Sequence, residues 1–300
     1  MNRVLRSVAA PVFRTVFPQL ARRRARNKYL RESVFPAPPP TADDLRFVPT
    51  RLIGPLGIDL HASDQLSLLN SWQSARYQEL FGVLRNDPSI NTNIYGHGLT
   101  ALHNGFFPTP DAEAYAAMII DRRPRRIVEV GSGYSTRVAR AAVRYAGYST
   151  EIVVIDPAPR ADVSSFADHV ILSPVEGSGR TLEDWTGEDI LFIDSSHVCR
   201  IRGDLPYLFC ELLPKLPRGT RVHVHDIFLP YDYPNVYDEL CYNEQYLLFC
   251  TLSHTPRYRT VFASHWLSRQ HGEAMRKTFG AAVGVDQLLY GASYWFDVLG

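Results

Sequence analysis

Two short stretches of the chain place carboxylates and imidazoles close together. They are Asp194-Ser195-Ser196-His197 and His223-Val224-His225-Asp226, and apolar residues typical of a buried strand precede or interleave each. Carboxylate oxygens favour Mg²⁺ or Mn²⁺, and an imidazole ligand tilts the choice toward Mn²⁺ or a softer ion. A bound divalent ion lowers the pKa of a hydroxyl, and a neutral histidine has a suitable pKa to take the proton. The predicted metal ligands are Asp194, His225 and Asp226.

The histidines of the second stretch carry two competing interpretations. Strand alternation puts His223 and His225 on the same face of one strand. For His223 we favour a structural role, hydrogen-bonded beneath a covering helix, whereas for His225 the structural and functional roles are equally open. Since His197 lies beyond a strand end, we favour function there. The chain has no HExxH and no GxSxG sequence, which disfavours a zinc protease and a serine hydrolase.

A glycine-rich turn follows an earlier apolar run. The sequence Ile127-Val128-Glu129-Val130-Gly131-Ser132-Gly133-Tyr134-Ser135-Thr136 predicts a strand, a turn and a helix capped by Ser135 or Thr136. Gly131 and Gly133 permit positive φ and close backbone approach to a ligand. The third glycine of a dinucleotide fingerprint and the Gly-Lys-Ser/Thr of a P-loop are missing. We predict that Glu129 reaches the amino-acid end of S-adenosylmethionine (SAM), through charge or a bridging water.

A second acidic residue supports a nucleoside ligand. Ile152-Val153-Val154-Ile155 ends in Asp156, roughly 20 residues past the glycines, where a carboxylate suits bidentate bonding to ribose hydroxyls. The alternative is an acid that is simply solvated at a strand end. The predicted cofactor-binding residues share a position at or just after a strand end; they are Glu129, Gly131, Ser132, Gly133, Ser135, Asp156 and Asp194.

The elements around these residues alternate between strands and helices. Strands are predicted over 126–130, 151–155, 169–172, 189–193 and 221–225, with late strands over 257–263 and 293–298. Helices are predicted over 65–84, 109–121, 136–145, 205–213 and 237–252. This order predicts βαβ units, an α/β fold and a mainly parallel sheet, whose ligands bind at the carboxyl ends of the strands.

Bulk properties restrict the function classes. The 300 residues carry a net charge of +1, which gives no overall bias toward nucleic acid, and no apolar run is long enough to cross a membrane. Four cysteines, none in a CxxC pair, indicate reduced thiols in a cytoplasmic protein. Residues 1–31 combine Lys and Arg with an apolar helical stripe. That segment predicts either peripheral membrane contact or, with equal weight, a partner-binding or dimer arm or a basic tail.

From about residue 104 to 266 the chain resembles the class I methyltransferases grouped as methyltransferase family 24. The matching segments occur in order: Phe106-Phe107-Pro108, the stretch from Glu129 to Thr136, Ile155-Asp156-Pro157, Phe192 to His197, His223 to Pro230, and Asn243-Glu244-Gln245-Tyr246. The resemblance implies a Rossmann-like seven-stranded sheet with helices on both faces, and SAM as methyl donor. It also implies three regions: a basic extension and proline-rich linker (1–40), a helical and loop-rich cap (41–105), and a SAM-dependent methyltransferase domain (106–300).

A looser similarity to macrolide-sugar O-methyltransferases implies individual roles. Those enzymes carry Asp-Gly-Ser-His and Glu-Asp at the two strand ends, and His225 stands here in place of their Glu. By that similarity Asp194 and Asp226 bind Mg²⁺ or Mn²⁺ and His197 is the general base, with all three counted as catalytic. The expected activity is O-methylation of a small molecule, with a sugar or glycolipid favoured. The alternative is a non-catalytic SAM-fold module that binds a partner, and a homo-oligomer is compatible with either.

Overall fold

The computed structural model describes residues 57–94, 96, 98–159, 162–178, 185–238, 240–286 and 288–300. The predicted basic extension and linker over residues 1–40, and residues 41–56 of the predicted cap region, lie outside the described residues. Within the described ranges, no helix is both long and apolar enough to span a membrane.

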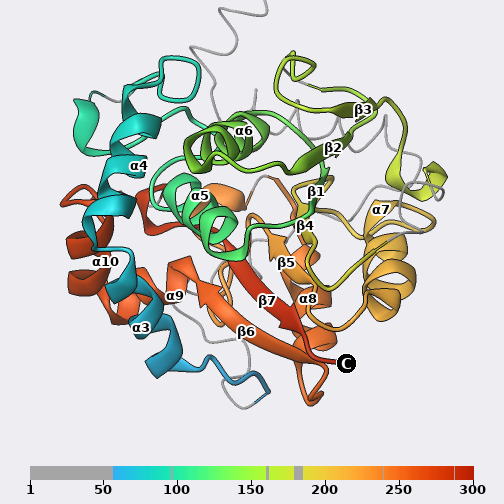
Figure 1. The fold of residues 1–300 in the computed structure, drawn as a ribbon. Helices are drawn as coiled ribbons and strands as arrows, with labels where there is room; N and C mark the ends of the chain where they lie inside the picture. The colour runs from blue at the N-terminus through green and yellow to red at the C-terminus, as the bar shows by residue number, and fades with distance from the viewer. Residues whose placement is uncertain are drawn as a thin grey trace, which may run out of the picture.

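A seven-stranded sheet forms the centre of the molecule (Figure 1). Its strand order is β3-β2-β1-β4-β5-β7-β6; the first five strands are parallel, and β7 runs antiparallel to both β5 and β6. This confirms the predicted Rossmann-like α/β fold. The strands are β1 (Arg126–Val130), β2 (Glu151–Ile155), β3 (His169–Ile171), β4 (Ile190–Ile193), β5 (Arg221–Val224), β6 (Tyr258–Ala263) and β7 (Tyr294–Val298).

The register of the parallel strands fixes where their carboxyl ends lie. Val130 of β1 pairs with Ile155 of β2 and Ile193 of β4, and Ile193 pairs with Val224 of β5. Because these last residues are level, the residue that follows each strand emerges at the same edge of the sheet. The glycine turn, Asp156, Asp194 and His225 therefore meet at one edge, although they are far apart in sequence.

One face of the sheet is covered by α5 (Asp111–Arg122) and α6 (Tyr134–Ala146), with α4 beside them (Figure 1). Alternate residues of the central strands point to this side, so that Ile127, Ile152 and Phe192 share one buried cluster with the inner sides of these helices. The residues that point to the other face, such as Val128, belong to a second buried cluster. Two elements cover this cluster: α8 (Glu244–Leu252) and a helical stretch that begins with α7 (Asp204–Pro206). The helical stretch continues as Tyr207–Leu212 and Leu213–Lys215. Burial on both faces explains why the strands are almost continuously apolar.

The predicted helix over 65–84 is two helices. They are α3 (Ala62–Ser71) and α4 (Ala75–Asn86), separated by a turn in which Ser74 is extended. Trp72 lies in that turn, is completely buried, and donates its indole N–H to Asp121 of α5 at 2.9 Å. The aromatic anchor therefore breaks the helix, because its ring must reach the core shared with α10 (Gly272–Phe279).

The predicted helix over 237–252 begins later than expected. Within this range only α8 (Glu244–Leu252) is α-helical, and a short helical turn at Asn235–Tyr237 precedes it. Between them Cys241 has a left-handed φ of 58°, which a continuous α-helix cannot contain. The stretch before α8 instead lies over the carboxyl edge of the sheet. Helix α9 (Ser264–Gln270) follows β6 directly.

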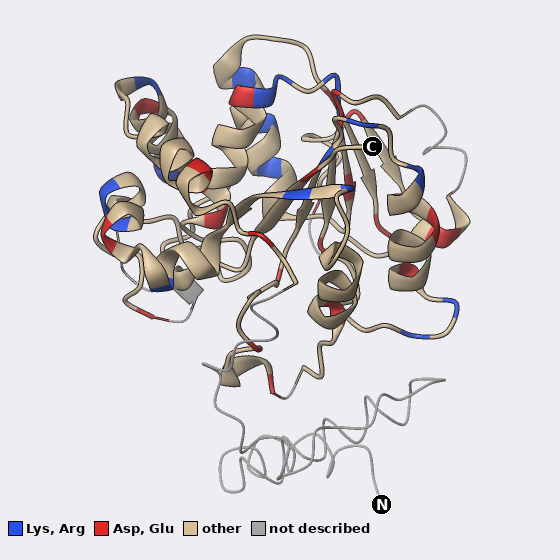
Figure 2. Ribbon diagram, turned by 90° about the horizontal axis from the view of Figure 1, so that it is seen from below, with Lys and Arg blue, Asp and Glu red and all other residues tan. Residues whose placement is uncertain are grey.

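Charged residues are spread over the described part of the chain (Figure 2). Blue and red segments alternate along the outer helices and loops, in keeping with the net charge of +1. Several acidic residues lie instead at strand and helix ends next to the sheet, where the site is found.

Candidate functional site

A cavity of about 970 Å³ opens at the carboxyl edge of the sheet. This is at the upper end of the range for small-molecule sites and is large enough for two ligands side by side. Its walls come from the loops after β1, β2, β4 and β5, as the strand register requires. The predicted site residues that line it are Gly131, Ser132, Gly133, Ser135, Asp156, Asp194, His197, His225 and Asp226.

The glycine turn packs directly against the backbone of Asp194. Gly131 has a φ of 90°, and a Cβ at this position would lie 1.9 Å from the carbonyl oxygen of Asp194. Gly133 also has a positive φ, but a Cβ there would meet no protein atom within 4 Å. Gly131 is thus needed for packing within the protein, whereas the space beside Gly133 is left for a ligand.

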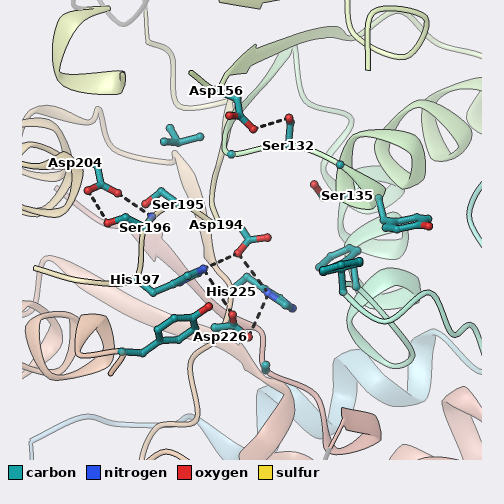
Figure 3. A pocket seen from close by; sticks show the side chains of 18 of the residues that line it. Ser132, Ser135, Asp156, Asp194, Ser195, Ser196, His197, Asp204, His225 and Asp226 are labelled. Atoms are coloured by element: carbon teal, nitrogen blue, oxygen red, sulfur yellow. Dashed lines mark hydrogen bonds and ion pairs between the residues drawn. The ribbon is translucent and has the colours of Figure 1, made fainter. Parts of the chain in front are cut away.

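Asp156 lies across the turn from Ser132. The Ser132 hydroxyl donates to Asp156 Oδ2 at 2.7 Å, and the Ala158 N–H donates to Oδ1 at 2.8 Å (Figure 3). These bonds hold the carboxylate at the cavity wall.

Glu129 does not lie where the sequence analysis placed it. Its side chain is completely buried and does not line the cavity. Its oxygens accept hydrogen bonds from Tyr115 at 2.9 Å and from Thr136, and burial, partly opposed by those bonds, raises its pKa to about 7. Because strand alternation turns Glu129 under α5, it braces the start of α6 from behind the turn instead of touching a ligand directly.

Asp194, His197 and Asp226 converge at the other end of the cavity (Figure 3). His197 Nε2 lies 3.2 Å from Asp194 Oδ1 and 3.6 Å from Asp226 Oδ2. One ligand atom from each of the three residues lies within 4.8 Å of the other two. Both His197 and Asp226 have left-handed φ values, 58° and 57°, which are unfavourable for residues with a Cβ and are concentrated at functional sites.

His225 is near this group but turns partly away from it. Its Nδ1 lies 3.8 Å from Asp194 and 3.7 Å from Asp226, while its Nε2 faces Asp111 of α5 at 3.4 Å. The residues that converge most closely on a cation position are therefore Asp194, His197 and Asp226, with His197 in the place that the sequence analysis gave to His225. The carboxylate of Asp111, which a sequence pattern does not reveal, explains the difference.

The surrounding carboxylates control protonation of the cluster. Burial alone lowers the pKa of His197, but hydrogen bonds to Asp194 and Glu244 and the charge of Asp226 outweigh it and raise the pKa well above its ordinary value. Burial raises the pKa of Asp194, but its bonds with His197 and His225 lower it to well below the ordinary value. The surrounding carboxylates therefore favour the protonated form of His197.

Comparisons with known proteins agree with this arrangement. Residues 128–227 match a protein-family profile described as a methyltransferase domain, Methyltransf_24, which spans the glycine turn, Asp156 and the whole cluster. An uncharacterised protein of Archaeoglobus fulgidus is 38% identical over 105 residues, which cover 35% of this chain and 44% of that protein. The match therefore spans less than half the length of that relative.

A solved structure also resembles the chain. It is the SAH-bound methyltransferase PaMTH1 of Podospora anserina, where SAH is S-adenosylhomocysteine. It has 18% identity and a TM-score of 0.35, and the match covers 63% of this chain and 78% of that one.

Further residues, which the sequence analysis did not assign to the site, surround His197. Glu244, completely buried at the start of α8, lies 2.9 Å from His197 Nδ1, and the ring of Tyr242 stacks on the same imidazole at 4.4 Å. Glu244 and Tyr242 come from a segment distant in sequence, so only the resemblance around residues 243–246 marked the region.

The remaining prediction about this end of the sheet concerns His223. It is completely buried, its Nε2 is 2.8 Å from the Ser293 hydroxyl, and its ring stacks on Trp295 at 4.0 Å. Burial lowers its pKa well below the ordinary value. It is hydrogen-bonded as predicted, with Ser293 and Trp295 as neighbours on one side, and its ring lies 5.4 Å from that of Tyr115 in the covering helix α5.

The donor set of the cluster fits a divalent cation. Neighbouring ligand atoms of octahedral Mg²⁺ lie about 3 Å apart when each is about 2.1 Å from the ion. The distances from His197 Nε2 to the two carboxylates, 3.2 and 3.6 Å, are close to this spacing. The two carboxylates suit Mg²⁺ or Mn²⁺, and the His197 imidazole faces the same cavity beside them.

Proposed function

We propose that the chain is a SAM-dependent O-methyltransferase. One observation carries this proposal: a single cavity joins the glycine turn and Asp156 to a cluster of two carboxylates and a histidine. A module that only binds SAM needs the glycine turn and Asp156 but not the cluster. A methyltransferase that activates a hydroxyl needs both parts, and needs them adjacent, because the acceptor oxygen must approach the sulfonium methyl in line.

In this proposal the residues around the glycine turn hold SAM, which supplies the methyl group on its sulfonium. Asp156 accepts hydrogen bonds from the ribose hydroxyls, and the turn at Ser132 and Gly133 lets the ligand approach the backbone. Ser135 lines the same wall at the start of α6. Glu129 keeps the turn in place through Thr136 and does not contact SAM directly.

The acceptor hydroxyl lies at the cluster, where His197 is the proposed general base. An imidazolium cannot accept a proton, so His197 is inactive as a base while Asp194 and Asp226 keep it protonated. A divalent cation on the two carboxylates would neutralise that charge and lower the pKa of the acceptor hydroxyl. The metal therefore belongs to the proposal, with Asp194 and Asp226 as its carboxylate ligands.

A sugar ring or a glycolipid headgroup remains the favoured acceptor. Tyr237 and Tyr242 line the cavity near the carboxylates, and Phe106 lines it next to Tyr134. Aromatic faces pack against the C–H faces of a sugar ring, while the carboxylates accept hydrogen bonds from its hydroxyls. The Tyr237 hydroxyl donates to Asp226 Oδ1 at 2.7 Å, which fixes one side of this acceptor region.

The test compares turnover with cofactor binding in the His197→Ala variant. SAH formation from SAM is followed with Mn²⁺ and a panel of glycosides, glycolipids and catechols as acceptors. We expect SAH formation with a glycoside or glycolipid in the wild-type protein, its loss in the variant, and an unchanged affinity of both proteins for SAH. Turnover that survives in the variant contradicts the base assignment, and methylation of catechols alone contradicts the acceptor class.

A further inference from the structure

Three consecutive residues hold the turn that carries His197. The Tyr242 ring stacks on the imidazole at 4.4 Å between centroids with an interplanar angle of 27°. Asn243 binds the backbone on both sides: its N–H donates to the His197 carbonyl at 3.0 Å, and its side-chain oxygen accepts the Cys199 N–H at 2.7 Å. Glu244 Oε2 lies 2.9 Å from His197 Nδ1. Ring face, backbone and ring edge are each contacted by a different residue.

The backbone of His197 needs such support. Its φ of 58° is unfavourable for a residue with a Cβ, and it is kept only when the surroundings impose it. The two Asn243 bonds fix the His197 carbonyl and the Cys199 N–H, and they link the loop after β4 to the start of α8. The conformation of His197 is therefore imposed by a segment more than forty residues away in the chain.

Glu244 decides which nitrogen of the imidazole faces the cavity. Because a carboxylate accepts hydrogen bonds, the Nδ1 atom beside Glu244 carries a proton, and Nε2 is the nitrogen that points to Asp194 and Asp226. Glu244 itself is completely buried and does not line the cavity, so it does not touch a ligand. Within the described residues its Oε1 has no hydrogen-bond partner.

A role in the helix alone does not account for this carboxylate. An acid in the first turn of a helix is favourable, and a solvated Glu244 would meet that need. Placing the charge in a fully buried position is costly unless it is paired, and the residue that pairs it is His197. The same pairing of a histidine with a buried carboxylate orients imidazoles in catalytic and metal sites generally.

We propose that Tyr242, Asn243 and Glu244 form a positioning clamp for His197, in which Glu244 directs Nε2 into the cavity. The value of that orientation for methyl transfer rests on the proposed function. The clamp itself is a property of the folded protein, and it is testable without an acceptor, a metal or SAM.

The experiment is NMR of the metal-free, full-length protein labelled with ¹⁵N-histidine. The wild type is compared with Glu244→Gln, Glu244→Leu and Tyr242→Leu, and His197→Gln assigns the His197 signals. We expect a resolved, slowly exchanging Nδ1–H proton for His197 in the wild type. Glu244→Gln should retain it, because an amide oxygen also accepts this bond, and Glu244→Leu should lose it. An Nδ1–H signal that is unchanged in Glu244→Leu overturns the proposal.

Tyr242→Leu keeps the clamp testable if Glu244→Leu does not fold. The stacked ring shifts the carbon-bound protons of His197 by its ring current, so we expect these protons to move downfield in Tyr242→Leu. Unchanged positions contradict the clamp. Calorimetric titration of SAH into the same samples reports separately on the proposed function: absence of binding to the wild type refutes that function and leaves the NMR result to decide the clamp.

Discussion

Replacing Gly131 by alanine should damage the protein far more than the same change at Gly133. Both residues have positive φ values, 90° and 151°, so each alanine brings backbone strain of about 1–2 kcal/mol. At Gly131 the added Cβ would also lie 1.9 Å from the Asp194 carbonyl oxygen, an overlap that forces the backbone apart. Overpacking of this kind costs about 1–3 kcal/mol more, which gives a total of about 2–5 kcal/mol for Gly131→Ala.

Gly133→Ala is the matched control because its Cβ would meet no protein atom within 4 Å. Thermal unfolding followed by circular dichroism measures the difference, at roughly 2–4 °C in Tm for each kcal/mol. We expect a lower Tm for Gly131→Ala than for Gly133→Ala, and weaker SAH binding by Gly133→Ala than its small stability loss explains. Equal midpoints for the two variants would refute the close packing of the turn against Asp194.

Three further predictions address the cofactor, the metal and protonation. Asp156→Ala should weaken SAH binding by roughly 10- to 150-fold in calorimetry, which is the effect of losing one hydrogen bond to a charged acceptor. Ser132→Ala should weaken it much less, and equal effects of the two substitutions would contradict a ribose contact at Asp156. Asp226→Asn should remove Mn²⁺ binding in electron paramagnetic resonance and leave SAH affinity within a few-fold, and retained Mn²⁺ would exclude this cation position. Because the pKa of His197 is raised above its ordinary value near 6.5, metal-free wild type should be more stable than His197→Gln at pH 6. Its advantage in unfolding free energy should shrink as the pH rises above 6.5, and an advantage that grows with pH would contradict the raised pKa.

The parallel strands were predictable because burial on both faces leaves a strong apolar signal. The predicted strands at 126–130 and 151–155 coincide with β1 and β2, and the others agree to within one or two residues. Since the register makes those strand ends level, Gly131, Asp156 and Asp194 could be assigned to one edge from sequence alone. The family resemblance implied the seven strands, but the order of the strands, with antiparallel β7 between β5 and β6, was not predicted and comes from the structure.

Side-chain direction and long-range partners were not predictable. Strand alternation gives the face of Glu129 but not which face lines the cavity, so its burial behind the glycine turn was not predicted. Asp111 draws Nε2 of His225 away from the cation position across more than a hundred residues of sequence. Glu244 likewise reaches His197 only because residues before α8 leave the helical path at Cys241. A single sequence carries no local signal for any of these contacts.

The central claim is that one cavity holds a SAM-type ligand next to a separate cation site. Calorimetric titration of SAH into metal-stripped protein, repeated after addition of Mn²⁺, tests it most directly. We predict micromolar SAH binding without metal, and an additional Mn²⁺ binding event that Asp226→Asn removes while SAH still binds. Absence of SAH binding under both conditions would contradict the account and would leave the cavity without the cofactor that it is proposed to hold.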